Sequence, residues 1–237
     1  MIHLTHWIIQ GETMYCVRHA CTVLTAASVL FAAGCGSPGV KKASIGDLAA
    51  WTVAGIGNMT PAPEEKAVRV REGANSKGLT LVSPRPFGDR VVVRFKVKPE
   101  QYEGVCVVLL SAADASTGGI AIPPDHDGGM AYWSEGTVHD YMVAFHTGYH
   151  QPNMFIRRNP GMAEIILKKD IATEQRWYDV EIGRAGAHVW MKVDGQPALD
   201  AIDPAGVMPG GYIGIRLRGP GDGSYSCLFR DVSIKDR

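Results

Sequence analysis

Polar and apolar side chains alternate along much of the chain beyond residue 43, a pattern typical of strands with one buried face. In residues 90–98 (RVVVRFKVK), the odd-numbered positions carry valine or phenylalanine, and the even-numbered positions carry mostly arginine and lysine. Successive side chains of a strand point to opposite faces, so this segment predicts a half-buried strand. Residues 105–110 (VCVVLL) are apolar throughout and predict a central strand covered on both faces.

Two segments late in the chain predict a pair of adjacent strands. Residues 177–183 (WYDVEIG) and 187–193 (AHVWMKV) both alternate, and Asp194-Gly195 follows them. Asp-Gly is a favoured hairpin turn because both of its residues take positive φ. Further strands are predicted over residues 138–145, 212–218 and 225–235.

These segments belong to an expected total of about ten to twelve short strands. The chain holds 28 Gly and 14 Pro, which occur singly or in pairs and indicate many turns. The one helical segment predicted is short, around residues 45–50. Many short strands predict an all-β sandwich or barrel, and no repeat of fixed period indicates a propeller. We therefore expect residues 44–237 to form a single β-sandwich domain.

The first 34 residues predict a signal peptide. Arg18 and His19 precede 14 mostly apolar residues (20–33), and small residues follow. The apolar run is shorter than the roughly 20 residues of a transmembrane helix. Met14 lies close upstream of Arg18 and is an alternative start to Met1.

Residues 32–35 (AAGC) resemble a bacterial lipobox, in which Cys35 would carry the lipid and become the new N-terminus. Residues 35–43 would then be the lipidated cysteine and a tether. The resemblance predicts an exported lipoprotein, anchored in the outer membrane or at the cell surface. The alternative is that Cys35 is an ordinary thiol in a cleaved or buried segment.

Charge and cysteine content sharpen this prediction. The chain has 24 Lys+Arg and 24 Asp+Glu, and this balance argues against a nucleic-acid partner. A lipid on Cys35 would supply the membrane affinity that charge does not. Once residues 1–34 are removed, Cys106 and Cys227 are the remaining cysteines besides Cys35. They either form a disulfide, which an oxidising compartment permits, or stay as two buried thiols.

Three segments resemble the concanavalin A-like lectin/glucanase superfamily. They are the alternating pair at 177–193, the segment GYIGIR at 211–216 and the segment CLFRDVSI at 227–234. The resemblance covers most of residues 45–237. It implies a jelly-roll β-sandwich of two antiparallel sheets, a fold on which sugars are bound or cleaved.

A narrower resemblance is to the YesU-like bacterial family of unknown function, often linked to the use of pectin or other polysaccharides. It is carried by residues 104–113, 136–145, 153–161 and 212–216. Met142 and Ala144 depart from the family, which tends to have His and Ser there. Any chemistry carried by those two positions is therefore not expected in this chain.

Residues 133–158 hold the densest group of side chains suited to a sugar. His139 and Tyr141 share one face of a predicted strand, and we expect that face to line a concave groove. With Arg157 they are the candidates for catalysis, because a His or Tyr near an Arg can abstract the proton α to a neutralised uronate, as in a polysaccharide lyase. The candidates for ligand binding are Trp133, His146, Tyr149, His150, Asn153 and Arg158. The alternative is that these residues are ordinary strand aromatics and a solvated loop.

Other acidic and metal-binding patterns are weaker. The chain lacks the Glu-x-Asp-x-x-Glu run of a retaining glucanase. Asp179 and Glu181 share a strand face and form either a hydrolytic pair or, as we expect, part of a solvated surface. Asp125 and Asp127 offer few ligands for a structural Ca²⁺. No cofactor and no other metal site is expected, since no Cys/His cluster has zinc spacing.

The sequence therefore favours an exported, membrane-anchored carbohydrate-binding protein that serves polysaccharide use. The first alternative is a polysaccharide lyase or glycoside hydrolase acting in the same groove. The second is a structural or interaction lipoprotein without a glycan ligand. An open groove lined by the candidate residues would favour binding or catalysis, and a covered one would argue against both.

Overall fold

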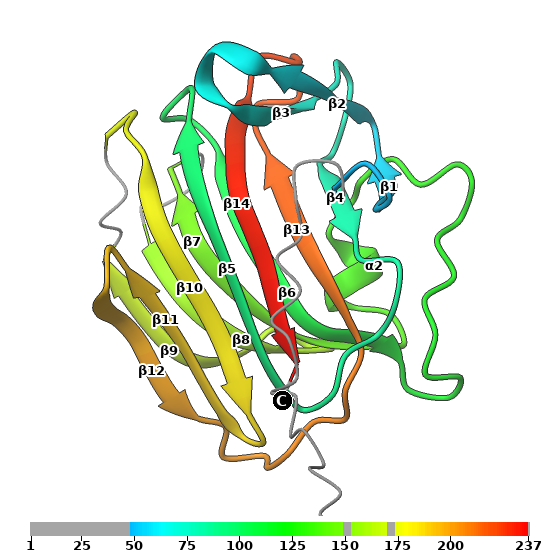
Figure 1. Cartoon of the computed structure of the whole chain (residues 1–237). Coiled ribbons are helices and arrows are strands. Elements are labelled where there is room, and N and C mark those ends of the chain that lie inside the picture. Colours follow the sequence, from blue (N-terminus) through cyan, green and yellow to red (C-terminus); the bar gives the residue numbers. More distant parts are fainter. Residues whose placement is uncertain (1–47, 149–152, 170–173, 237) are drawn as a thin grey trace, which may run out of the picture. The chain divides into compact units, whose positions relative to one another are not determined.

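The computed structural model describes residues 48–148, 153–169 and 174–236, which form two antiparallel sheets of seven strands each (Figure 1). The described residues belong to one compact unit. The predicted signal peptide, Cys35, the tether, Tyr149 and His150 lie outside them, as do residues 45–47 of the helix expected around residues 45–50. Within these ranges no helix has the length and apolar character needed to span a bilayer.

The two sheets are named sheet 1 and sheet 2. In spatial order, sheet 1 consists of β1 (Thr52–Gly55), β4 (Leu79–Val82), β13 (Tyr212–Arg218), β6 (Val105–Asp114), β7 (Val138–Thr147), β8 (Asn153–Asn159) and β9 (Ala163–Lys169). Sheet 2 consists of β12 (Gln196–Ile202), β11 (His188–Val193), β10 (Tyr178–Ala185), β5 (Arg90–Pro99), β14 (Ser226–Asp236), β3 (Ala67–Glu72) and β2 (Gly57–Ala62). The predicted jelly-roll sandwich of two antiparallel sheets is confirmed.

The strongest sequence patterns correspond to central strands. In β5, Val93 and Phe95 are buried between the sheets while Arg94 is exposed, as the alternation predicts. The turn between β11 and β12 has φ of 52° at Asp194 and 77° at Gly195, which confirms the predicted hairpin turn. Local sequence thus sets which face of β5 is buried and where the chain reverses.

The structure also contains elements that the pattern did not predict. The described ranges form fourteen strands rather than ten to twelve, because short edge strands such as β9 are largely exposed and carry no clear alternation. A short 3-10 helix, η1, covers Pro63–Glu65, and a single helical turn, α2, covers Ala131–Ser134. Elements of one turn are too short to show helical periodicity.

Apolar side chains pack on both faces of β6, which confirms its predicted position as a central strand. Cys106 and Val108 point into the main core between the sheets. Val105 and Val107 belong to a second apolar cluster, so they lie on the outer face of sheet 1. Part of this outer cluster is covered by α2, whose Trp133 is fully buried. The outer face of sheet 1 is therefore apolar where an ordinary sandwich surface would be polar.

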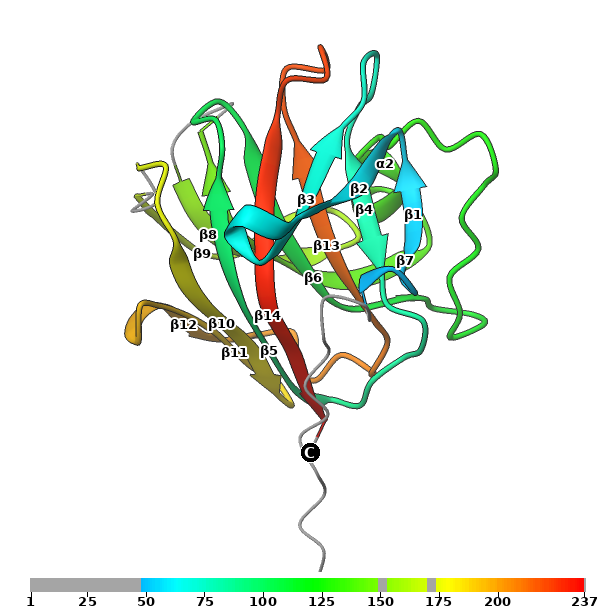
Figure 2. The ribbon, with the colours of Figure 1, turned by 45° about the horizontal axis from the view of Figure 1, so that its top comes forward.

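The long connection from β6 to α2 projects beside β1 and β4 in both ribbon views (Figures 1 and 2). It is fixed to sheet 1 where Arg216 of β13 donates from Nη1 to the carbonyl oxygen of Gly128 over 2.7 Å. Gly128 has a φ of 85°, and a Cβ there would lie 1.7 Å from the carbonyl oxygen of Gly78. Glycine at position 128 thus lets the connection approach the sheet closely.

Of the two alternatives for the cysteines, a disulfide or two buried thiols, the structure has two free thiols. Cys106 on β6 and Cys227 on β14 are both buried and unpaired with each other. Burial raises the pKa of the Cys227 thiol to about 12 and raises that of Cys106 as well. Both side chains therefore act as small apolar core residues.

Candidate functional site

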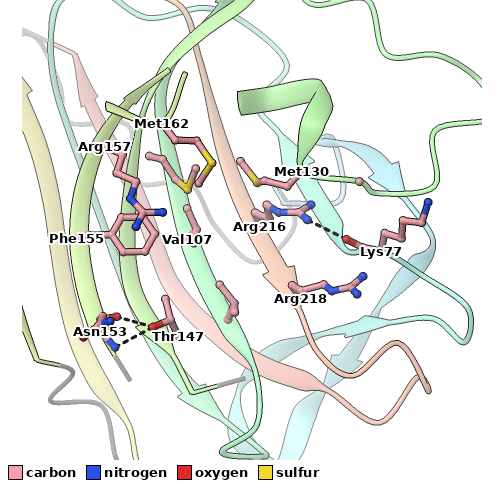
Figure 3. A pocket seen from close by; sticks show the side chains of 13 residues that line it. Lys77, Val107, Met130, Thr147, Asn153, Phe155, Arg157, Met162, Arg216 and Arg218 are labelled. Atoms are coloured by element: carbon pink, nitrogen blue, oxygen red, sulfur yellow. Dashed lines mark hydrogen bonds between the residues drawn. The ribbon is translucent and has the colours of Figure 1, made fainter. Parts of the chain in front are cut away.

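A cavity of about 530 Å³ lies on the outer face of sheet 1 (Figure 3). Its apolar lining residues are Val105, Val107, Met130, Met142, Phe155 and Met162. Its cationic lining residues are Lys77, Arg157, Arg216 and Arg218, and Gly129, Thr147 and Asn153 complete the lining. An apolar floor with a cationic rim is the distinctive feature of this cavity, which is called the pocket below.

Strand register explains how these residues meet. Arg216 pairs with Val107 across β13 and β6, and Val107 pairs with Ala144 across β6 and β7. Ala144 in turn pairs with Phe155 on β8, so a continuous row crosses four strands. Paired residues share a face, and adjacent strands lie about 4.8 Å apart, which separates β13 from β8 by about 14 Å. Two walls result, formed by the arginines of β13 and by Arg157 of β8.

On the β13 wall, Arg216 is held entirely by neutral acceptors within the described chain. It is buried and donates to the carbonyl oxygens of Gly128 and Lys77 over 2.7 and 2.9 Å. Burial lowers the pKa of the guanidinium to about 10, so it remains charged at neutral pH. These bonds clamp two loops to the sheet and leave the charge without a hydrogen-bonded carboxylate.

Arg218 and Lys77, the other two cationic lining residues near β13, each have a carboxylate close by. Arg218 donates from Nη1 to the carbonyl oxygen of Ser76 over 2.9 Å and lies 3.6 Å from Glu72. The exposed Lys77 ammonium lies 2.8 Å from Oδ2 of Asp127. The ion pair at Lys77 is therefore close and exposed, while that at Arg218 is longer and backed by a fully buried carboxylate.

On the β8 wall, Arg157 is positioned by stacking. Its guanidinium carbon lies 4.1 Å from the centroid of the Phe155 ring, a cation–π distance. The nearest carboxylate is Glu164, with Oε2 at 3.9 Å from Nη2, which is beyond hydrogen-bond distance. The Nε of Arg157 is buried and has no hydrogen-bond partner among the described residues. Figure 3 shows this guanidinium over the Phe155 ring at the pocket.

A polar pair closes the pocket at one end. The Thr147 hydroxyl donates to the carbonyl oxygen of Asn153 over 2.8 Å and accepts from the Asn153 N–H over 2.9 Å. These two bonds link β7 to the start of β8 and place both residues at the pocket, as Figure 3 shows.

The lining restricts the chemistry that the pocket can perform. Among its described lining residues there is no Asp, Glu, His, Tyr or Cys. A pair of carboxyl groups flanking the scissile bond is what glycoside hydrolysis ordinarily requires. The pocket thus has the groups for binding and orienting a ligand. Among the lining residues that the structure describes, Lys77 is the one besides the arginines that carries an ionisable group.

Of the sequence-predicted site residues, Arg157 and Asn153 line the pocket. Tyr141 does not: it is fully buried between the sheets, and its hydroxyl donates to Oδ2 of Asp203 over 2.8 Å. His139 shares that strand face and does not line the pocket either. The prediction that these two residues face the groove is therefore wrong, because the groove lies on the opposite face of β7, where Met142 lies.

The partly buried position of His139 has an electrostatic consequence. Burial lowers the pKa of its imidazole, and the nearby guanidiniums of Arg158 and Arg184 lower it further. Arg158 itself forms an ion pair with Asp203 and donates to the carbonyl oxygen of Gly206 over 3.1 Å. The two interactions of Arg158 link β8 to the loop after β12.

Trp133 and His146 also pack away from the pocket. Trp133 is fully buried in α2, where its ring lies 4.8 Å from that of Tyr132. His146 is fully buried, with Nε2 2.9 Å from the carbonyl oxygen of Tyr102. Both residues were expected to contact ligand directly. Neither is among the described lining residues, and Trp133 instead belongs to the apolar cluster that includes Val107 and Met142.

The acidic residues considered for hydrolysis or for calcium binding do not line the pocket. Glu181 is on the outer face of sheet 2, where Oε2 lies 2.5 Å from Nη2 of Arg94 and Oε1 accepts from Trp190 Nε1 over 3.1 Å. It belongs to a surface ion-pair network. Asp127 is bonded to Lys77 and to the Gly129 N–H, and no group of three or more His, Cys, Asp or Glu suited to a metal exists among the described residues. The calcium possibility gains no support from this arrangement.

The chain is similar to known proteins in its fold and not in its sequence. No known protein family and no curated protein matches the sequence. A Bacillus subtilis protein of unknown function with a galectin-like fold has a TM-score of 0.69 at 15% identity, with 82% of this chain and 92% of that one covered. The Bacillus subtilis carbohydrate-binding module CBM66 has a TM-score of 0.53 at 12% identity, with 79% and 96% covered.

A third similar structure is the exoplasmic/lumenal domain of VIP36 in a form bound to Ca²⁺ and Man3GlcNAc. Its TM-score is 0.54 at 14% identity, with 79% of this chain and 85% of that one covered. At such low identities the matches establish a galectin-like, concanavalin A-like sandwich and nothing finer. The fold expected from the sequence resemblance is thereby confirmed.

Proposed function

We propose that the protein binds a carbohydrate in the pocket on sheet 1. The observation that carries this proposal is the pocket itself, a hollow of about 530 Å³ with an apolar floor and polar groups on both walls. Ligand sites combine largely apolar surfaces with a few placed polar groups. The C–H faces of a sugar ring suit the floor formed by Val107, Met142 and Phe155, and its hydroxyls suit donors such as Arg157.

Binding without turnover is favoured over catalysis. The described lining residues supply no carboxylate for hydrolysis, and the Lys77 ammonium, which would need to lose its proton to act as a base, is instead ion-paired with Asp127. The candidates for proton abstraction, His139 and Tyr141, lie on the other face of β7. The lyase alternative therefore loses two of its three catalytic candidates and keeps only Arg157 at the pocket, and the hydrolase alternative finds no carboxylate pair among the described lining residues.

The location and family of the protein are part of the same proposal. Arg18, the apolar run over residues 20–33 and Cys35 support export and lipid attachment. Membership of the YesU-like family is supported by the four sequence segments described above. An anchored binding protein on this fold would hold a polysaccharide close to the membrane for further use.

Glycan binding by the full chain tests the proposal, with a matched pair of variants. Phe155 lies in the pocket under Arg157, and Phe87 lies outside it under Arg85; in both cases the guanidinium carbon is 4.1 Å from the ring centroid. The two rings are also similarly buried, at 8% and 9% exposed. Affinity gel electrophoresis against a panel of soluble polysaccharides would identify a ligand, and calorimetry would quantify it.

Phe155→Ala is expected to weaken binding of that ligand by about tenfold or more, since it removes an aromatic group from the floor. Phe87→Ala should lose similar stability and leave the affinity within about twofold. Equal losses in both variants would show that the effect is one of folding and would count against the pocket. Failure to bind any glycan across the panel would refute the proposed function.

A further inference from the structure

We infer that the glycan bound in the pocket is anionic and that its carboxylate or sulfate group is held by Arg157. This inference rests on the proposed function and names the ligand class of the same site. It is carried by the charge, the hydrogen-bond state and the orientation of the lining side chains.

The described lining of the pocket carries an excess of positive charge. Four of the thirteen lining residues are cationic, and none of the described ones is acidic. The chain as a whole is neutral, with 24 basic and 24 acidic residues, so this excess is a property of the pocket. A low-dielectric floor strengthens the effect of these charges on a bound group, because apolar surface screens them less than water does.

The four cations of the pocket differ in how closely a carboxylate neutralises them. Lys77 has a carboxylate at 2.8 Å, whereas the carboxylates of Glu72 and Glu164 lie 3.6 and 3.9 Å from Arg218 and Arg157. Arg216 is bonded to carbonyl oxygens, which satisfy donors without cancelling charge. The positive potential of the pocket is therefore only partly compensated by the described protein.

The guanidinium of Arg157 is held in a fixed orientation at the pocket. Its planar guanidinium is held over the Phe155 ring, so that its orientation is set before a ligand arrives. Most of its donors are unused by the described residues, and its buried Nε has no partner. A guanidinium with free donors in a fixed plane matches a carboxylate or sulfate oxygen pair, which it binds through two parallel charge-assisted hydrogen bonds.

The two cationic walls add a condition on the ligand. Arg157 on β8 and the arginines of β13 are separated by two intervening strands, or about 14 Å between strand axes. A glycan lying across β6 and β7 meets positive charge at both ends. An acidic oligosaccharide fits this arrangement better than a neutral one, whose hydroxyls would leave the charges uncompensated.

Calorimetry of the full chain tests the inference with matched glycans. The ligands are oligogalacturonates, their carboxyl-reduced neutral counterparts of equal length, and a sulfated glucan oligosaccharide. We expect an acidic ligand to bind at least about tenfold more tightly than the neutral one. Its affinity should fall as ionic strength rises from about 50 mM to about 300 mM, because added salt screens the attraction.

Variants then assign the effect to Arg157. Arg157→Ala should weaken binding of the acidic ligand about ten- to a hundredfold, and Arg157→Lys should fall in between, because it keeps the charge and loses the planar fork. Arg85→Ala is the control, since Arg85 also stacks on a phenylalanine and also has a carboxylate beyond hydrogen-bond distance, at 3.6 Å. It should leave affinity within about twofold.

The outcomes separate the inference from the function on which it rests. Preference for the uronate or for the sulfated glycan supports the inference and shows which oxyanion is bound. Equal binding of the neutral glycan, or equal losses in Arg157→Ala and Arg85→Ala, overturns the inference and leaves glycan binding intact. Absence of binding to all three ligands overturns the inference, and it overturns the proposed function as well when no glycan of the polysaccharide panel binds.

Discussion

Asp140 provides a sharp test of the structure, because it is a carboxyl group with no access to solvent. It lies on β7 opposite Asn159 of β8, and both side chains are at most 1% exposed. Asn159 Nδ2 donates to Asp140 Oδ1 over 2.9 Å. Within the described residues, Asp140 Oδ2 and Asn159 Oδ1 have no hydrogen-bond partner.

A single proton would satisfy both of these atoms. Protonated Asp140 can donate from Oδ2 to Asn159 Oδ1 while it accepts at Oδ1, which gives a reciprocal acid–amide pair. Burial raises the pKa of the Asp140 carboxyl to about 8, from 3.8 in the exposed state. We therefore predict that Asp140 is neutral in the folded protein at pH 7.

The sign of the pH dependence follows from this raised pKa. Between about pH 4 and pH 8 the folded protein keeps a proton that the unfolded chain has released, so stability falls as pH rises through that range. Asp140→Asn reproduces both hydrogen bonds and cannot ionise. At 1.36 kcal/mol per pH unit, the variant should gain on the order of 4 kcal/mol over the wild type by pH 7, and almost nothing at pH 4.

Urea unfolding of the full chain at several pH values measures this gap, through the free energy of unfolding extrapolated to water. The exposed Asp179 on sheet 2 supplies a control, because Asp179→Asn makes the same change in net charge at a solvated site. Parallel stability curves for the wild type and Asp140→Asn between pH 5 and pH 8 would refute the reasoning, since they would mean that Asp140 is charged in its buried position.

Three further predictions concern the interior and the pocket rim. Tyr141→Phe removes the hydrogen bond to Asp203 and should cost about 2 kcal/mol in chemical denaturation while leaving glycan affinity unchanged; a selective loss of affinity would restore Tyr141 to the site. Gly78→Ala should destabilise the fold and weaken binding, because φ is 128° and a Cβ would lie 2.5 Å from the Arg216 guanidinium; unchanged thermal unfolding would contradict the geometry. Cys106 and Cys227 should resist alkylation at pH 8 until the protein unfolds, and labelling of either thiol in the native state, mapped by mass spectrometry, would show that the core opens.

The fold was predictable where local signals agree with tertiary structure. The alternation in β5 and the Asp194-Gly195 turn are set by side chains a few residues apart, and both are observed. Continuous burial of β6 also followed from its composition. These features depend on burial and backbone preference, which a short segment of sequence encodes.

Which face of β7 lines the pocket could not be predicted from the sequence, for a physical reason. Nearly every residue from Val138 to Thr147 is buried, because one face packs in the sandwich core and the other under α2 and at the pocket. A strand buried on both sides gives no polar–apolar contrast that distinguishes inside from outside. The choice of His139 and Tyr141 over Met142 as groove residues therefore rested on residue type alone, and the structure reverses it.

The cationic rim was missed because long-range pairing assembles it. Lys77 and Arg216 are far apart in sequence and meet only because β4 pairs with β13. Arg157 was identified, but through its position in a conspicuous window, and its stacking on Phe155 appears only in the structure. The one signal available was the presence of arginines in the otherwise apolar strand GYIGIRLR, which favours either a buried network or a site.

The manner in which the pocket arginines are held argues for electrostatic function beyond structural support. A carboxylate partner would satisfy the donors of Arg216 and cancel its charge, whereas the carbonyl oxygens of Gly128 and Lys77 satisfy them and leave the charge in place. Arg157 reaches the same state by another route, since the Phe155 ring orients the guanidinium without neutralising it. Burying an arginine costs solvation free energy that an apolar side chain would avoid. Two independent means of keeping oriented cations beside an apolar floor, with no hydrogen-bonded carboxylate among the described residues, are what an anion-binding site requires, and packing alone requires neither.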